Sequence, residues 1–503
     1  MKTLFFQSTR VRIAIVFSLI ILDFLIFVLP YYVNDYVVPV GWDTAWYVRN
    51  MRVIADQGLL FLFEKTSEIN LYVIFGYLIS SIFHVSFTIT EKFLPIIIGI
   101  SFPLVNFQIV KKFSKSWRLS LLAMGLSIID FNIIRMVTDL HRNLFCFILV
   151  EIALFLVLPD LLEKVSKKKV GVFIVLLVLA GLSHMETFAV VMLALSFLLV
   201  FYLRQQLFQR AKLLLLCIVV SCSLVILFES PFLPTFLRGH LVFNSTSKFS
   251  YERFVAQPWS YALSLGSGLI PFYVVGLYTS LSTYTRNRKG QLPFIIPLWN
   301  LVVIACSFIP WLGIKIPGYR FLLLATVPLL SIIGFAKLFA GKSLKLKRLV
   351  IPITLSAVVI TVQIVNFSVH YKPWISNSEY EKLTWIGNHK QNDPCIFVLY
   401  FDKAKWTYGE ADLYRNWVLG IIGARTNVYF GNVEYLLDPQ PGPTPSESYY
   451  MNMTSWNFWN GMENFTMNGT SIYLIEEWYK ITPYPDYLKQ VNDGVYRVEI
   501  NHN

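Results

Sequence analysis

Gly41-Trp42-Asp43-Thr44-Ala45-Trp46-Tyr47-Val48-Arg49-Asn50 follows an apolar run over Ile13–Val28, and this junction sets the arrangement of the whole chain. Further apolar runs of about 18–22 residues recur downstream, with short basic clusters between them, as in polytopic membrane proteins. No small-residue cleavage site follows the first run, so we expect it to be retained as a membrane span. The quoted stretch would then be the first segment beyond the membrane, with one carboxylate among two indoles and a phenol.

The composition agrees with a helical polytopic membrane protein. Of the 503 residues 55% are hydrophobic and only 15% are charged, and the mean hydropathy is +0.57, values far from those of a soluble domain. The net charge of +13 does not indicate a nucleic-acid partner. Residues 371–503 hold 10 basic and 15 acidic side chains, and the remainder holds 33 and 15, mostly in short clusters between apolar runs. Such clusters carry topological information, and the partner they indicate is the lipid bilayer.

The charge pattern predicts a multi-pass protein of the cell membrane with about eleven spans. Lys2, Arg10 and Arg12 place the N-terminus in the cytoplasm, and a last span over Leu349–Val369 sends the tail outside. Leu71–Phe87 is expected to lie along the membrane or dip into it, although whether residues 70–88 cross stays open, and Phe93–Val110 is the next span. The cytoplasmic clusters are Lys111–Arg118, Lys164–Lys169, Arg204–Lys212, Arg286–Lys289 and Lys342–Arg348.

The tail differs from the rest of the chain. We expect residues 1–370 to form the membrane domain, with a first external loop over 31–70, and residues 371–503 to form an extracytoplasmic α/β domain. Helix-like patterns alternate there with strand-like segments. The helical patterns cover Ser378–Asn388 and Gly409–Ile421, and the strand-like segments are Cys395–Tyr400, Asn427–Phe430, Ser471–Ile475 and Val495–Ile500. The five cysteines imply no disulfide or zinc framework.

On this topology the external face collects polar side chains at the membrane edge, where ionisable residues are functional candidates. Such a set suits transfer from a phosphate-linked lipid, since a carboxylate can deprotonate an acceptor hydroxyl and arginine can stabilise a departing phosphate. Each residue alone could equally be interfacial, and the aromatic ones could form a membrane-interface belt. The set comprises Asp43, Tyr47, Glu64, Glu68, Arg135, Asp139, His141, Arg142, Asn143, His184, Glu186, Glu229, Arg238, His240, Tyr319 and Arg320.

These segments resemble the GT-C superfamily of membrane glycosyltransferases, which includes protein O-mannosyltransferases, oligosaccharyltransferase catalytic subunits and aminoarabinose transferases. The loop Gly41–Tyr47 resembles the one that carries the family's essential acidic residue. Similar family features are Glu68-Ile-Asn-Leu-Tyr72, Arg135-Met-Val-Thr-Asp139-Leu-His-Arg142-Asn143, Leu182-Ser-His184-Met-Glu186-Thr187 and Pro317-Gly-Tyr319-Arg320. Order and spacing over most of residues 1–340 carry this resemblance.

The resemblance implies an inverting hexosyl transfer, outside the cytoplasm, from a polyprenyl- or dolichyl-phosphate-linked sugar to a glycan, lipid-linked oligosaccharide or protein acceptor. It implies catalytic roles for Asp43 and Asp139. It also implies donor or acceptor binding by Trp42, Tyr47, Glu68, Arg135, His141, Arg142, His184, Glu186, Tyr319 and Arg320, with Arg320 contacting the donor phosphate. The tail lacks a Trp-Trp-Asp motif, which argues against an oligosaccharyltransferase.

Metal dependence and two other classes of function stay open. Asp139-Leu-His141 replaces the family's Asp-x-Asp, which favours a metal-free enzyme, although Asp43, Asp139 and His141 could hold a divalent ion such as Mg or Mn. A lipid-glycan transporter or flippase should show internal repeats and charges deep in the membrane, and neither is visible. A non-catalytic subunit of a glycan assembly complex would tolerate the loss of Asp43.

Overall fold

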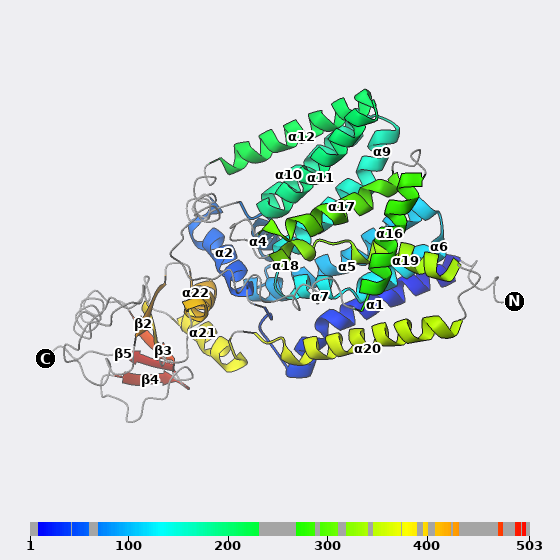
Figure 1. Cartoon of the computed structure of the whole chain (residues 1–503). Coiled ribbons are helices and arrows are strands. Elements are labelled where there is room, and N and C mark those ends of the chain that lie inside the picture. The colour runs from blue at the N-terminus through cyan, green and yellow to red at the C-terminus, as the bar shows by residue number, and fades with distance from the viewer. Residues whose placement is uncertain are drawn as a thin grey trace. The chain divides into compact units, whose positions relative to one another are not determined.

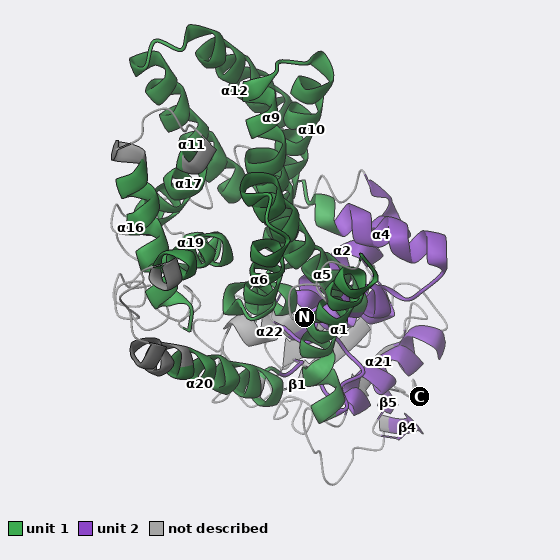
Figure 2. Cartoon of the chain, turned by 90° about the vertical axis from the view of Figure 1, so that its right-hand side faces the viewer, with its two compact units in different colours: residues 1–34, 66–72, 93–371 green, residues 35–65, 73–92, 372–503 purple. Residues whose placement is uncertain are grey.

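The chain forms two compact units (Figure 2). Unit 1 comprises residues 1–34, 66–72 and 93–371, and unit 2 comprises residues 35–65, 73–92 and 372–503. Unit 2 thus combines the tail with segments from the first hundred residues, and the predicted division at residue 370 stays a prediction. The computed structural model describes residues 9–41, 43–59, 69–230, 268–286, 292–309, 318–340, 346–373, 375–389, 396–400, 408–423, 426–431, 471–475, 488–493 and 495–498.

Unit 1 is helical, and α4 and α5 contribute to both units. In Figure 1 α10, α11 and α12 lie side by side, and α20 runs along α1. The helices are α1 (Thr9–Asn34), α4 (Leu71–Phe83), α5 (Phe87–Ser114), α6 (Trp117–Ile128), α7 (Phe131–Thr138), α8 (His141–Glu151), the π-helix η2 (Ile152–Val157), α9 (Leu158–Glu163), α10 (Lys167–Ser183), α11 (Met185–Arg204), α12 (Phe208–Glu229), α16 (Ile270–Arg286), α17 (Leu292–Cys306), α18 (Gly318–Leu322), α19 (Val327–Ala340) and α20 (Leu346–His370).

The prediction of a helical membrane protein is confirmed. In the described part of the chain five helices are long and apolar enough to cross a membrane, and a bent pair could supply a sixth. The five are Thr9–Asn34, Phe87–Ser114, His141–Glu163, Met185–Arg204 and Phe208–Glu229. α4 has 13 residues, which at 1.5 Å per residue is shorter than the hydrocarbon core of about 30 Å. The count of eleven spans stays a prediction.

The bent pair is α6 and α7, which meet at 50°. Asp130 causes the break, because its carboxylate accepts a hydrogen bond from the N–H of Asn132 at 3.1 Å and so starts a new helix. Ser116 starts α6 in the same way by accepting from the N–H of Leu119. The polar residues between the apolar runs therefore fix where the helices begin.

Helices α16 and α19 pack with direct backbone contact at two glycines. A Cβ atom on Gly276 would overlap the carbonyl oxygen of Leu330, and one on Gly334 would overlap the carbonyl oxygen of Phe272. Small residues at such positions let two membrane helices approach closely, which increases their van der Waals contact.

Unit 2 contains a mixed five-stranded sheet of order β2-β1-β3-β5-β4, with β1 parallel to β2 and β3, and β5 antiparallel to β3 and β4. Helices α21 and α22 lie on one side of this sheet (Figure 1). β4 has no counterpart among the strand-like segments of the sequence. The elements are α2 (Thr44–Gln57), α21 (Asn377–His389), β1 (Ile396–Tyr400), α22 (Tyr408–Ile422), β2 (Asn427–Gly431), β3 (Ile472–Ile475), β4 (Leu488–Asn492) and β5 (Val495–Val498).

The first loop is part of the core of unit 2. Val38, Ala45 and Val48 from the loop are buried in one apolar cluster with Trp417 and Val418 of α22. Gly420 lies against Val48, since a Cβ there would be 2.9 Å from the Val48 side chain. Helix α2 is therefore fixed by a helix more than 350 residues later in the chain, and the carboxylate that precedes it is fixed with it.

Candidate functional site

The candidate site in unit 1 is built on the C-terminal end of α7. The guanidinium of Arg135 lies over the ring of Tyr319 at 4.8 Å from its centroid, a cation–π contact that holds the guanidinium plane in place. Asp139 ends the helix, and its N–H donates to the carbonyl oxygen of Arg135 at 3.1 Å. Arg135 on α7 and Tyr319 on α18, from two of the segments that carry the resemblance, therefore meet.

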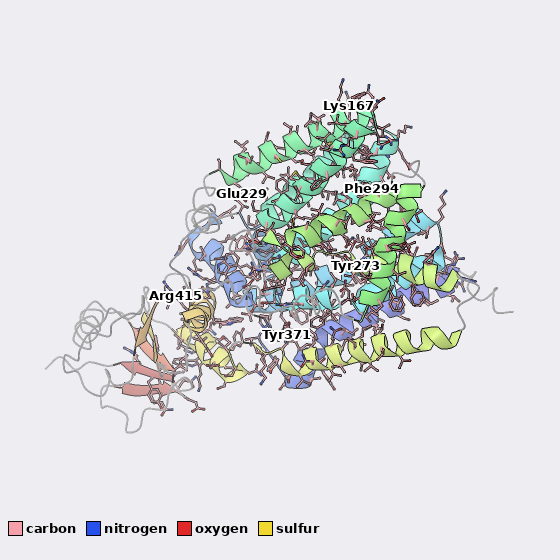
Figure 3. The ribbon with its side chains drawn as sticks, in the orientation of Figure 1. Lys167, Glu229, Tyr273, Phe294, Tyr371 and Arg415 are labelled. Atoms are coloured by element: carbon pink, nitrogen blue, oxygen red, sulfur yellow. The ribbon has the colours of Figure 1, made fainter. Side chains whose placement is uncertain are left out.

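Tyr371 joins this group from the end of α20, where Figure 3 labels it. Burial raises the pKa of its phenol, and the charge of Asp139 and the neighbouring Tyr319 raise it further. The guanidinium of Arg135 and a hydrogen bond with Thr138 act in the opposite direction. The phenol is therefore protonated at neutral pH and lies beside a fixed positive charge. We name Arg135, Asp139, Tyr319 and Tyr371 the arginine–tyrosine cluster.

The positive charge of Arg135 in this cluster is not neutralised by an ion pair with a described residue. Among the residues that the structure describes, its guanidinium forms no ion pair with a carboxylate, and its buried Nε atom has no hydrogen-bond partner. A buried guanidinium nitrogen without an acceptor is costly, so an anionic ligand would be favoured here. The planar guanidinium fork matches the oxygens of a phosphate.

His141 lies at the start of α8, and its side chain is almost fully buried. Its Nδ1 atom is 3.4 Å from the hydroxyl of Tyr72 at the start of α4, and the two rings are 5.7 Å apart. The carboxylate of Glu229 fixes the same end of α4 by accepting from the N–H of Ile69 at 3.1 and 3.2 Å. Both residues position the segment that follows the first loop.

His184 and Glu186 have a local structural role at the start of α11. The Nδ1 atom of His184 accepts from the N–H of Thr187 at 3.2 Å, and its Nε2 atom is 3.7 Å from the carboxylate of Glu186. This is an N-terminal cap made by an imidazole, with an acidic residue in the first turn. The predicted binding role of both residues stays a prediction.

An asparagine network fixes the segment that carries Tyr319 and Arg320. The side-chain oxygen of Asn300 on α17 accepts from the hydroxyl of Tyr273 and the N–H of Thr326, both at 3.1 Å. Its amide nitrogen donates to the hydroxyl of Thr326 at 2.6 Å. Because α18 ends at Leu322 and α19 begins at Val327, this network holds the turn between them.

We expect Asn300→Leu to lower the melting temperature in detergent. The change leaves the N–H of Thr326 and the Tyr273 hydroxyl buried without partners, at a cost of about 1–3 kcal/mol each. Ser196→Ala is the control, because it removes one exposed hydrogen bond within α11. Equal melting temperatures for the two variants would show that the network does not stabilise the fold.

In unit 2 the predicted site residues of the first loop lie around Asp43. The carbonyl oxygen of Asp43 accepts from the N–H groups of Trp46 and Tyr47 at 3.1 and 3.2 Å, whereas its carboxylate makes no capping hydrogen bond. Gly41 precedes it with a φ of 116°, a conformation that favours glycine. The rings of Trp46 and Tyr47 pack edge to face at 5.5 Å. The backbone of Asp43 rather than its carboxylate starts the helix, so the side chain is not used as a cap.

A side-chain hydrogen bond ties this helix to the tail. The guanidinium of Arg49 donates to the side-chain oxygen of Asn416 at 2.8 Å, whereas the pair of Arg52 and Asp56 at 3.2 Å lies within α2. Asn416 is buried, so its bond to Arg49 has little competition from water. The start of α2, including Asp43, therefore has a defined position within unit 2.

Comparison with known proteins gives matches in structure only. No protein-family model matches the chain, and no curated protein matches its sequence. ArnT from Cupriavidus metallidurans bound to undecaprenyl phosphate aligns with a TM-score of 0.55 and 13% identity over 98% of each chain, and apo ArnT with 0.55 and 11% over 97% of each. The archaeal oligosaccharyltransferase AglB from Archaeoglobus fulgidus, in complex with an inhibitory peptide and a dolichol-phosphate, aligns with 0.53 and 13%, covering 92% of this chain and 69% of AglB.

The chain has the fold of ArnT and AglB. Both neighbours are GT-C glycosyltransferases, so the resemblance seen in the sequence is confirmed at the level of the fold. The likeness to ArnT does not assign roles to individual residues, because the sequence identity is too low to transfer such roles.

Some predicted site residues come together in the ArnT-like fold and others do not. Arg135, Asp139 and Tyr319 share one cluster, and Arg142 and Arg320 are half-buried on α8 and α18 beside them in sequence. Trp42 and Glu68 lie outside the described residues. Tyr371 was not predicted as a site residue from the sequence. Its position just after the last apolar run is the feature that could have indicated it, but a tyrosine at that position is also typical of the membrane interface.

The residues for a divalent ion are incomplete where the structure describes them. No group of three His, Cys, Asp or Glu side chains suited to a metal occurs among the described residues. His141 directs Nδ1 toward the hydroxyl of Tyr72. The predicted set of Asp43, Asp139 and His141 stays a prediction, and no step of the proposed chemistry is routed through a metal.

Proposed function

We propose that this chain is a membrane glycosyltransferase that moves a sugar from a polyprenyl- or dolichyl-phosphate donor to an acceptor outside the cytoplasm. The observation that carries the proposal is the guanidinium of Arg135, which lies over the ring of Tyr319, forms no ion pair with a carboxylate among the described residues, and acts electrostatically on Tyr371. The neighbours are named as complexes with undecaprenyl phosphate and dolichol-phosphate. A lipid phosphate is the ligand that fits such a cluster.

The proposed reaction needs one base and one cationic group. The base is a carboxylate, a role that the resemblance gives to Asp43; it takes the proton of an acceptor hydroxyl, whose oxygen forms a bond to the anomeric carbon of the sugar. The bond between that carbon and the phosphate oxygen breaks, and the lipid phosphate leaves with the electron pair. Arg135 and Arg320 stabilise the negative charge, and the Tyr371 hydroxyl donates to it. Attack opposite the leaving group inverts the anomeric configuration.

We expect Arg135→Met to weaken binding of undecaprenyl phosphate by about 10- to 100-fold, as for the loss of a charged hydrogen bond of about 1.5–3 kcal/mol. Native mass spectrometry of the purified chain measures this without knowledge of the acceptor. Arg204→Gln is the control, because Arg204 is exposed in the last turn of α11. If both variants bind undecaprenyl phosphate equally, the lipid phosphate does not bind at this cluster.

Transfer is then measured in liposomes with radiolabelled polyprenyl-phosphate sugars and a membrane glycan extract. Radiolabel in the glycan fraction would support glycosyltransferase activity. Labelled lipid that crosses the bilayer without transfer supports a flippase instead, and binding without either outcome supports a non-catalytic subunit.

A further inference from the structure

A second group of charged and aromatic side chains surrounds Trp117 at the start of α6. The guanidinium carbon of Arg12 on α1 is 5.5 Å from the centroid of the Trp117 ring, and the Nζ atom of Lys111 on α5 is 5.3 Å from it. Phe107 packs edge to face on the indole at 4.9 Å. Three helices thus place two cations on one indole, and we name Arg12, Lys111 and Trp117 the indole–cation cluster.

This cluster lies at the opposite end of unit 1 from the arginine–tyrosine cluster. The far end of α1 is fixed beside the end of α20, where the amide of Asn34 donates to the carbonyl oxygen of Ser368 at 2.8 Å. Arg12, by contrast, is in the first turn of α1. The charge pattern of the sequence assigns the Arg12 end to the cytoplasm. The indole–cation cluster is therefore separate from the site proposed for transfer.

The charges around the cluster are largely positive. Lys112 pairs with Asp160 at 2.6 Å, so that lysine is neutralised. In the part of the chain that the structure describes, Lys111 forms no ion pair with a carboxylate, and neither do Lys115 in the link to α6 and Arg118 in the first turn of α6. The first turn of α6 adds the positive end of its helix dipole. An anion would therefore be favoured beside Lys111.

The neighbouring surface indicates what kind of anion this is. Ile13 and Phe17, on the turns of α1 next to Arg12, are each 62% exposed. Large apolar side chains exposed beside a tryptophan and two cations are typical of a membrane interface. A molecule that contacts both surfaces needs an acidic head and apolar chains.

We propose that the indole–cation cluster is a binding site for the headgroup of an anionic phospholipid, whose acyl chains lie against Ile13 and Phe17. The phosphate contacts Arg12 and Lys111, and Trp117 holds both cations at the depth of the headgroups. Basic pockets between membrane helices bind acidic lipids through the same combination of charge and depth. The proposal does not depend on the transferase function.

The test is lipid retention by the full chain in a neutral detergent, measured by native mass spectrometry with palmitoyl-oleoyl-phosphatidylglycerol and the matching phosphatidylcholine. We expect one tightly retained phosphatidylglycerol. Arg12→Gln with Lys111→Gln should weaken it about 30-fold, about fivefold for each charge. The matched control is Lys167→Gln with Lys168→Gln, two exposed lysines at the start of α10, and it should change binding less than twofold.

Several results would overturn the proposal. These are equal weakening by both double variants, equal retention of phosphatidylcholine, or displacement of the lipid by inorganic phosphate alone, which would indicate a free-phosphate site. Lys111→Gln serves if the double variant does not fold, because Lys111 is exposed and its loss removes no packing. Trp117→Leu should weaken retention about threefold, since it removes the cation–π contacts but keeps the apolar bulk.

Discussion

Replacing Asp43 by Asn is expected to lower sugar transfer by about 10²–10⁴-fold, the usual contribution of a general base, while undecaprenyl phosphate binding stays unchanged. The substitution should not unfold the loop, because the Asp43 backbone carbonyl, not its carboxylate, starts α2. Asn is also well tolerated before a helix. Transfer rate in liposomes and lipid retention in detergent, measured on the same preparation, separate chemistry from binding.

The matched control is Asp56→Asn, on the same helix. Asp56 forms an ion pair with Arg52 at 3.2 Å on a partly exposed surface, and such pairs contribute about 0–1 kcal/mol. Full transfer by the Asp56 variant and none by the Asp43 variant would assign the base. If the Asp43 variant, equally abundant and folded, transfers at the full rate, the chain uses another base or is not the transferase.

Gly276→Ala is expected to destabilise unit 1 by about 3 kcal/mol, at the upper end of the cost of one extra methyl in a packed interior. The added Cβ would overlap the Leu330 carbonyl oxygen, which belongs to the backbone of α19 and cannot rotate away. Helices α16 and α19 would have to separate. The effect is measured as a change in melting temperature in detergent, monitored by the loss of the monodisperse species.

Gly171→Ala is the control, because nothing lies within 4 Å of a Cβ at that position in α10. There the alanine should be neutral or stabilising by up to about 1 kcal/mol, since glycine is a poor helix former. Gly334→Ala should behave like Gly276→Ala, because it meets the Phe272 carbonyl oxygen from the other helix. A stable Gly276 variant would mean that the two helices are less closely packed.

The sequence predicted the elements that depend on local properties. The apolar runs predicted a helical membrane protein because a helix satisfies its own backbone hydrogen bonds in lipid, wherever its neighbours lie. Ser116 and Asp130 mark helix starts through contacts two or three residues away. The resemblance also grouped Arg135 and Asp139 with Tyr319, because the order of loops along a membrane chain limits which of them share a face.

The sequence could not predict contacts that depend on distant packing. The addition of Tyr371 to the arginine–tyrosine cluster depends on how α20 packs against the bundle, and hydropathy carries no such information. The place of α2 in unit 2 depends on Val48 meeting Gly420 and on Arg49 meeting Asn416. Such contacts result from shape complementarity and buried hydrogen bonds between remote segments, which only the tertiary structure decides. The sequence by itself determined that the chain is a helical membrane protein, because that depends on the hydropathy of each segment; the tertiary structure determined which polar side chains meet, because that depends on how distant segments pack.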